Sequence, residues 1–315
     1  MDPDSYLRDF KNNFFIGNYS KNIETWRDVL DESQFGEHIM KIDFYIARSL
    51  IAQTKLAYKI QLNEKKNKLT EQFQGITKLT NNFIGGILVN NVDVQKLKES
   101  FYSFKDDRVQ SLVHYLIWLY MGIQSGQLEE VMKSEKETDQ ANFPFKEESE
   151  IIYLQFLAFL QANNLNKAQQ KLNKLRAIDD EDVLTLLAQV YYNMNSDNEN
   201  VAIQYLGELK ERFGDSPFLI NLKISILMRQ QKFAPAFALG QQLFTILTTK
   251  ENLKNSSELE ILVTNMISLG EILNKPIDEY LQSLQQINYD CINVERAQKL
   301  SQNFDDFCSK MSTKA

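Results

Sequence analysis

Three alanines near the middle of the chain recur at a fixed interval: Ala168, Ala202 and Ala236 follow one another every 34 residues. Ala168 is followed at helical spacing by Leu172 and Leu175, and the matching positions after the other two alanines carry leucine or glycine. Such a stripe is typical of an amphipathic helix. A second apolar helical pattern lies about sixteen residues before each alanine. The interval therefore predicts helix pairs that repeat in phase.

A period of 34 residues is that of the tetratricopeptide repeat, an antiparallel helix pair that stacks on copies of itself. Alanine at the start of the second helix lets the two helices approach closely. The copies are degenerate, because the glycine expected five residues before each alanine is replaced by Asn163, Asp197 and Gln231. Stacked helix pairs offer an extended binding surface. We therefore expect a binding protein more than a catalytic one.

The composition agrees with an all-α fold, since 315 residues contain only 5 prolines and 11 glycines to punctuate turns. We expect a tetratricopeptide-like α-solenoid of roughly eight to nine helix pairs that spans residues 1–315 as a single domain. The clearest repeats cover residues 150–250, and residues 61–105 are expected to be irregular. Residues 133–150 are polar and suggest a connection, and an amphipathic helix at 294–311 is expected to cap the array.

Local signals place several helix boundaries. Gly17 and Gly126 are expected in the turns of helix pairs on the N-terminal side of the clear repeats. Ser216 is expected to cap a helix whose first turn holds Pro217, a position that proline tolerates. These signals extend the predicted helix pairs beyond the strict period.

Charge and apolar content exclude several classes of protein. The net charge of −7 argues against a nucleic-acid-binding domain, which would gather Lys and Arg on one face. The longest strongly apolar stretch, residues 115–123, is too short to span a bilayer. The N-terminus has no signal-peptide pattern, and Cys291 and Cys308 have no paired spacing. We expect a soluble, cytoplasmic protein.

No catalytic, cofactor-binding or metal-binding residues are predicted. His38 and His114 are the only histidines, and the sequence contains no phosphate-binding glycine loop and no nucleophile motif. The acidic run at residues 179–182 could suggest a magnesium site. Its place between two predicted helices favours the alternative, that it stabilises the N-terminus of the second helix.

The first helix of each pair is expected to line a concave groove that suits a peptide or helix from a partner. Packing against a neighbouring repeat is an equally good interpretation of the same positions. The candidate groove residues are Tyr153, Leu157, Leu160, Gln189, Tyr192, Phe218, Asn221, Ser225 and Met228.

Several sequence blocks along the chain resemble the epsilon-subunit family of coatomer. They occur at residues 11–23, 50–56, 165–187, 280–284 and 304–307, in the order and rough spacing of that family. Residues 60–105 show little resemblance. The similarity covers nearly the full length of the chain.

The resemblance implies a tetratricopeptide solenoid that serves as a non-catalytic component of the COPI vesicle coat. It also implies a partner, the C-terminal domain of the coatomer alpha subunit, which this family binds and stabilises. The setting would be Golgi-to-ER and intra-Golgi transport, with the protein peripheral on Golgi and COPI vesicle membranes. No cofactor is implied.

Two other functions remain open on the sequence alone. One is another tetratricopeptide adaptor that holds a partner peptide in its groove, although the predicted first helices are poor in the basic residues of a carboxylate clamp. The other is an enzyme built on a solenoid-like helical fold, which a metal or cofactor bound to the purified protein would favour.

Overall fold

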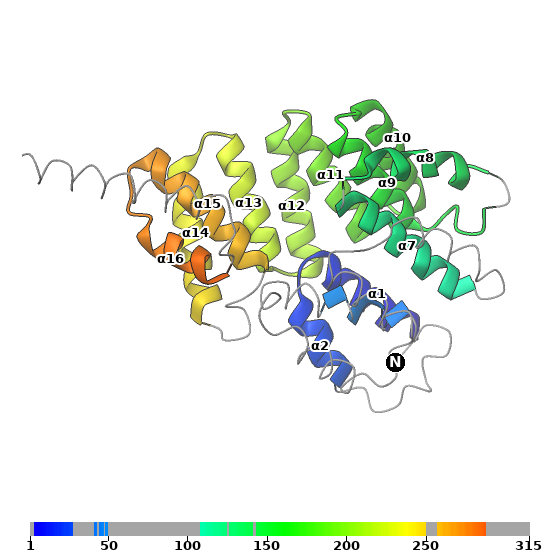
Figure 1. Ribbon diagram of the computed structural model, residues 1–315, viewed down its shortest axis with the longest axis horizontal. Coiled ribbons are helices and arrows are strands. Elements are labelled where there is room, and N and C mark those ends of the chain that lie inside the picture. Colours follow the sequence, from blue (N-terminus) through cyan, green and yellow to red (C-terminus); the bar gives the residue numbers. More distant parts are fainter. Residues whose placement is uncertain are drawn as a thin grey trace, which may run out of the picture. The chain divides into compact units, whose positions relative to one another are not determined.

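The computed structural model describes residues 3–27, 41–42, 44–46, 48–49, 108–124, 126–140, 143–249 and 257–287. All regular structure within these ranges is helical, which confirms the predicted all-α class (Figure 1). The helices are α1 (Pro3–Phe15), α2 (Tyr19–Arg27), α7 (Arg108–Gln124), α8 (Leu128–Thr138), α9 (Ser149–Gln161), α10 (Leu165–Ile178), α11 (Val183–Asn195), α12 (Glu199–Phe213), α13 (Pro217–Arg229), α14 (Phe233–Thr249), α15 (Ser257–Leu273) and α16 (Asp278–Ile287).

The 34-residue period governs the three central helix pairs. Helices α9, α11 and α13 begin at residues 149, 183 and 217, and their partners α10, α12 and α14 begin at 165, 199 and 233. Ala168, Ala202 and Ala236 are each 0% exposed, so the three periodic alanines are packing residues of the second helices. The repeat inferred from the sequence is therefore confirmed here.

One left-handed residue joins the helices of each pair. Asn163, with a φ of 56°, is representative: the N–H of Asn164 donates to the carbonyl of Phe159 at 2.8 Å, which ends α9 in a Schellman turn. The same turn recurs with a positive φ at Gly17, Gly126, Asn163, Asp197, Gln231 and Asn274. Glycine is therefore dispensable here, since the chain takes the left-handed conformation with Asn, Asp or Gln as well.

The described chain divides into two compact units with their boundary between Leu219 and Ile220. In the first unit, α9 is the central helix, because α7, α8, α10 and α11 all pack against it. Nearly every residue of α9 from Glu150 to Leu160 is buried. A helix that is apolar on all sides can be stable only when it is enclosed in this way.

The second unit consists of α14, α15, α16 and the greater part of α13. Buried side chains from all four helices form one apolar cluster, which includes Ile224, Phe244, Met266 and Tyr280. Gly240 on α14 lies directly against α15, since a Cβ there would be 2.2 Å from the Sδ of Met266.

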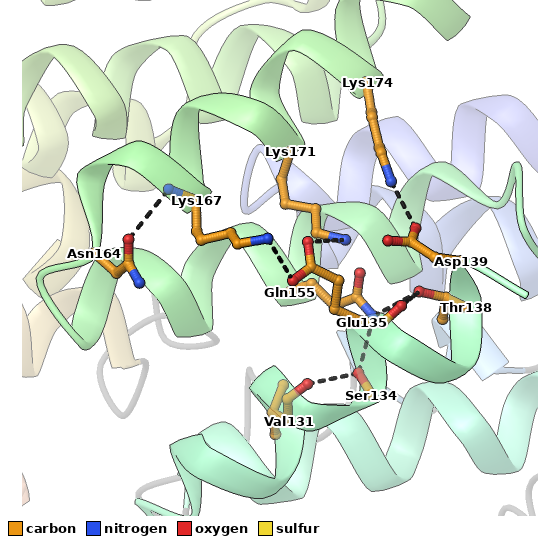
Figure 2. A network of polar contacts seen from close by, with 10 residues as sticks. All are labelled: Val131, Ser134, Glu135, Thr138, Asp139, Gln155, Asn164, Lys167, Lys171 and Lys174. Atoms are coloured by element: carbon orange, nitrogen blue, oxygen red, sulfur yellow. Dashed lines mark hydrogen bonds and ion pairs between the residues drawn. The ribbon is translucent and has the colours of Figure 1, made fainter.

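Residues 133–150 were expected to be a connection, but the first and last of them are helical. Helix α8 continues to Thr138, and α9 begins at Ser149. Buried polar residues in the second half of α8 are paired with α9 (Figure 2): Nε2 of Gln155 donates to Ser134 and Thr138, at 2.8 and 3.2 Å. Buried polar groups with hydrogen-bond partners are compatible with a packed helix.

The same network joins α8 to α10 through charge (Figure 2). Glu135 lies 3.1 Å from Nζ of Lys167 and 3.2 Å from Nζ of Lys171, and Asp139 lies 2.7 Å from Nζ of Lys174. Lys171 is only 1% exposed, and burial lowers its pKa despite the neighbouring Glu135. We name these residues, with Ser134, Thr138 and Gln155, the α8 polar layer.

Other sequence expectations fall on residues outside the described ranges. These are the irregular segment at 61–105, the capping helix at 294–311 and the second half of the helix pair at 42–60. The total of eight to nine helix pairs and the single domain include these segments and stay predictions. No helix in the described part of the chain is long and apolar enough to cross a membrane.

Candidate partner-binding surface

The nine candidate groove residues lie on α9, α11 and α13, the first helices of the central pairs, but they differ in how open they are. Leu157, Tyr192, Phe218, Ser225 and Met228 are partly exposed. The remaining four, Tyr153, Leu160, Gln189 and Asn221, are buried, with exposed fractions of 9% or less. The contacts made over each of these helices therefore decide which of the candidate positions a partner can reach.

The N-terminal part of the chain covers two of the candidate residues. The ring of Phe15, at the end of α1, meets the ring of Tyr153 edge to face with 5.8 Å between centroids. Gly17 lies against Phe218, so closely that a Cβ on the glycine would be 2.5 Å from Cβ of Phe218. We use the term N-terminal segment for the described residues between 3 and 49, which comprise α1, α2 and the helical residues at 41–49.

Three helix N-caps at the same period contact this N-terminal segment. Glu148, Asp182 and Ser216 precede α9, α11 and α13, and we name them the N-cap row. Lys41 lies 3.8 Å from Glu148, and Lys11 lies 3.0 Å from Asp182. The row therefore faces the N-terminal segment along three successive repeats.

One ion pair that the N-terminal segment makes with α9 is almost fully buried. Arg48 forms an ion pair with Glu150, and both side chains are almost fully enclosed, at 5% and 1% exposure. The guanidinium carbon of Arg48 lies 4.2 Å from the ring centre of Phe14 and 4.9 Å from that of Phe44. Cation–π contact and a hydrogen-bonded counter-charge together make this buried charge tolerable.

Two tyrosines near this ion pair are held in their neutral form. Burial raises the pKa of Tyr45 well above its usual value, and the adjacent Glu150, which accepts its hydroxyl hydrogen bond at 2.8 Å, raises it further. Burial also raises the pKa of Tyr153, with smaller contributions from Tyr191 and Glu150. Neither phenol is therefore a source of an ionised nucleophile at neutral pH.

The other buried candidates have partners within their own units. Oε1 of Gln189 accepts from Arg176 at 2.5 Å. In the second unit, Nδ2 of Asn221 donates to the carbonyl of Glu258 at 2.9 Å, and Ser225 donates to the carbonyl of Asn221 at 3.1 Å. The amide groups of Gln189 and Asn221 therefore tie neighbouring helices together.

The C-terminal half of α11 is more open than its first half. Residues from Val183 to Val190 are buried, whereas Tyr191, Tyr192, Asn193 and Met194 are partly exposed. Tyrosine and methionine among amides suit an apolar or helical segment of another protein. Whether the nine candidate residues bind a partner stays a prediction.

The acidic run at 179–182 has structural contacts. Asp182 caps α11 by accepting from the N–H of Leu184 at 2.9 Å. Glu181 accepts a bidentate pair of hydrogen bonds from Arg212 on α12. Arg212 accordingly lowers the pKa of Glu181. Within the described ranges, no group of three or more His, Cys, Asp or Glu residues is placed to hold a metal ion.

A cavity of about 290 Å³ lies beside α1 in the first unit. Its lining includes the apolar side chains of Leu112 and Leu116 from α7. Four of its charged wall groups already form the ion pairs Lys11–Asp182 and Lys41–Glu148. The cavity is therefore part of the contact between the N-terminal segment and the N-cap row.

Comparison with known proteins identifies the family to which this helical chain belongs. The profile of the family described as "Coatomer epsilon subunit" matches residues 4–312 of the chain. The chain belongs to the coatomer epsilon-subunit family. It is also similar to "Coatomer subunit epsilon" of Dictyostelium discoideum, with 25% identity over 295 residues that cover 88% of this chain and 90% of the relative. The match confirms the family that the sequence blocks resemble.

Membership of the coatomer epsilon family makes the chain a subunit of the COPI vesicle coat, a structural component of vesicle transport. The family match runs through the N-terminal segment, the three in-phase pairs and the pair α15–α16. It therefore includes both the N-cap row and the open part of α11.

Proposed function

We propose that this chain is a non-catalytic subunit of the COPI coat that binds and stabilises the C-terminal domain of the coatomer alpha subunit. It would act in Golgi-to-ER and intra-Golgi transport, in the cytoplasm and peripherally on Golgi and vesicle membranes. The observation that carries the proposal is the family match over residues 4–312.

The partner surface in this proposal consists of the more open candidate residues. Tyr192 lies in the part of α11 that the neighbouring helices leave partly exposed, and Leu157 is partly exposed on α9. In the second unit, Met228 and Ser225 are partly exposed on α13. An apolar anchor from the alpha subunit could be desolvated on such side chains, which is the usual basis of binding hot spots.

A capture experiment tests the surface with matched controls. The full chain is co-expressed with the tagged C-terminal domain of the alpha subunit, and Tyr192→Glu and Met228→Glu are compared with Tyr205→Glu and Ile246→Glu. Tyr205 is a partly exposed tyrosine on α12, and Ile246 is 44% exposed on α14. We expect each groove variant to weaken capture by about tenfold or more, as for hot-spot residues, and the controls to bind normally.

The outcomes separate the partner from the surface. Failure of the unchanged chain to retain the alpha-subunit domain would contradict the proposed function. Retention by the unchanged chain and equally by both groove variants, with circular dichroism showing intact helices, would place the contact elsewhere on the chain.

The alternative of a carboxylate-clamp adaptor has less support. Helices α9 and α11 contain no Lys or Arg, and α13 contributes only Lys223 and Arg229. A clamp for an acidic peptide end needs several cations on these first helices. Binding of a peptide that ends in acidic residues, and not of the alpha-subunit domain, would favour this alternative.

A further inference from the structure

We propose that the N-terminal segment is an internal brace that couples three successive repeats through the N-cap row. The inference does not depend on which partner the chain binds. It rests on contacts within the first unit, where one segment meets Glu148, Asp182 and Ser216 in turn.

Lys11 provides the first bridge between repeats. Its ammonium donates to Oγ of Ser149, the first residue of α9, and to Oδ2 of Asp182, the N-cap of α11, each at 3.0 Å. One side chain therefore joins two helix N-termini that lie 34 residues apart in the sequence. The Lys11 side chain is only 17% exposed, and this partial shielding from solvent strengthens its ion pair with Asp182.

Ser216 provides the next bridge. Its hydroxyl donates to the carbonyl of Ile16 in the turn after α1, and its oxygen accepts from the N–H of Leu219 at 3.1 Å. The same side chain thus caps α13 and holds the N-terminal segment. Gly17, beside Ile16, is pressed against Phe218, so apolar contact reinforces this point.

The ion pair between Arg48 and Glu150 anchors the other end of the brace to α9. Removing one partner from a buried pair leaves the other charge without compensation, so this anchor resists opening. The hydroxyl of Tyr45 donates to the second oxygen of Glu150, so both carboxylate oxygens accept a hydrogen bond. The brace is therefore fixed at α9, α11 and α13.

Such contacts are unlike those of a simple repeat array. In a solenoid, each repeat contacts its neighbours, and local opening of one repeat is felt mainly by the next. Here one segment contacts three successive first helices, at sequence separations of 138, 171 and 200 residues. The brace couples their opening and holds the spacing of α9, α11 and α13 at their N-terminal ends.

Hydrogen exchange of the full chain tests the coupling. The variants Lys11→Met and Glu150→Gln remove the first bridge and the anchor. We expect exchange to rise by about tenfold in the segment from α1 to Gly17, as for the loss of a charged hydrogen bond. We also expect it to rise in α11 and in the first turn of α13, although neither variant changes a residue of α13.

The matched control is Arg212→Met. Arg212 binds Glu181, the immediate neighbour of Asp182, but on the side of the loop that faces α12. We expect this variant to leave exchange in α1 and in the first turn of α13 unchanged. If Glu150→Gln fails to fold, Lys11→Met, whose side chain is less buried, still decides the question.

Two results would overturn the brace. One is a rise in exchange for Lys11→Met that stays within α1 and the first turns of α9 and α11, with the start of α13 unchanged. The other is a rise in all three helices for Arg212→Met that equals that of Lys11→Met. Because exchange is measured without the alpha subunit, neither result bears on the proposed partner.

Discussion

The pair α7–α8 differs from the three in-phase pairs in which helix carries the small residue where the two helices meet. Five residues after the left-handed turn residue, the in-phase pairs place alanine, whereas α8 places Val131. Four residues before it, they place Phe159, Asn193 or Leu227, whereas α7 places Gly122. A Cβ on Gly122 would lie 2.6 Å from Cγ2 of Val131, so these two positions meet. Either helix of a pair can supply the small residue.

The same pairs also differ in how they fill the next turns. Four and seven residues after the periodic alanine, α10 buries Leu172 and Leu175, and α12 buries two leucines as well. At the equivalent positions α8 has Glu135 and Thr138. Those polar groups are acceptable because the α8 polar layer supplies their partners (Figure 2). One backbone arrangement therefore accepts either an apolar layer or a polar layer joined by hydrogen bonds and ion pairs.

The largest expected effect comes from unpairing the α8 polar layer. Glu135→Gln removes the counter-charge of Lys171, which is 1% exposed. We expect a loss of roughly 3 kcal/mol in the free energy of unfolding, the usual result of breaking a buried pair. Lys171→Met should cost less, within about 1 kcal/mol, because methionine fills the same space and Glu135 keeps Lys167. Urea unfolding of both variants checks this order, and equal losses would contradict it.

The lowered pKa of Lys171 adds a dependence on pH. The unfolded chain binds this proton more tightly than the folded chain, so stability should rise as pH rises from the lowered folded value towards 10.5. Lys171→Met removes the contribution. The difference in unfolding free energy between the two proteins should therefore change across that pH window and be flat below it.

The contact between Gly122 and Val131 predicts a smaller loss of stability, which a compensating change at the other position should partly reverse. Gly122→Ala places a methyl group against Val131 and should destabilise the chain by about 1–2 kcal/mol, as overpacking does. Val131→Ala alone should also destabilise, since it removes buried volume. The double variant should lose less stability than the two single variants lose together. A double-mutant cycle of thermal unfolding measures this coupling. Additive losses would show that the two positions do not share one space.

The sequence predicted the parts of this fold that depend on local pattern. The three alanines, the turns at Gly17 and Gly126 and the start of α13 at Ser216 and Pro217 were all correct. The second half of α8 was missed, because partners of its buried polar residues, namely Gln155 and lysines of α10, lie outside the helix. No periodicity in α8 itself reveals those partners.

The sequence placed the candidate surface on three helices but did not show which of its residues are exposed. Which of its members are covered depends on contacts such as that of Phe15 with Tyr153, between residues far apart in the sequence. The N-cap row carried a usable signal, since Glu148, Asp182 and Ser216 repeat at the 34-residue period. What the sequence could not supply was the identity of the segment that lies on that row.

The smallest expected effect concerns the turn residue that distinguishes the two kinds of pair. Gly126→Ala should cost about 1 kcal/mol from backbone strain alone, because its φ is +75° and no atom lies within 4 Å of the added Cβ. Gln231→Gly makes the opposite change at a φ of 59°. It should be neutral or stabilise by a few tenths of a kcal/mol, since relief of strain exceeds the added entropy of the unfolded chain. Asn163→Gly should change less, because asparagine tolerates this conformation better than glutamine. The three midpoints of chemical unfolding should therefore fall, from highest to lowest, in the order Gln231→Gly, Asn163→Gly, Gly126→Ala. A Gly126→Ala midpoint equal to that of the unchanged chain would show that the turn between α7 and α8 is not held left-handed in solution.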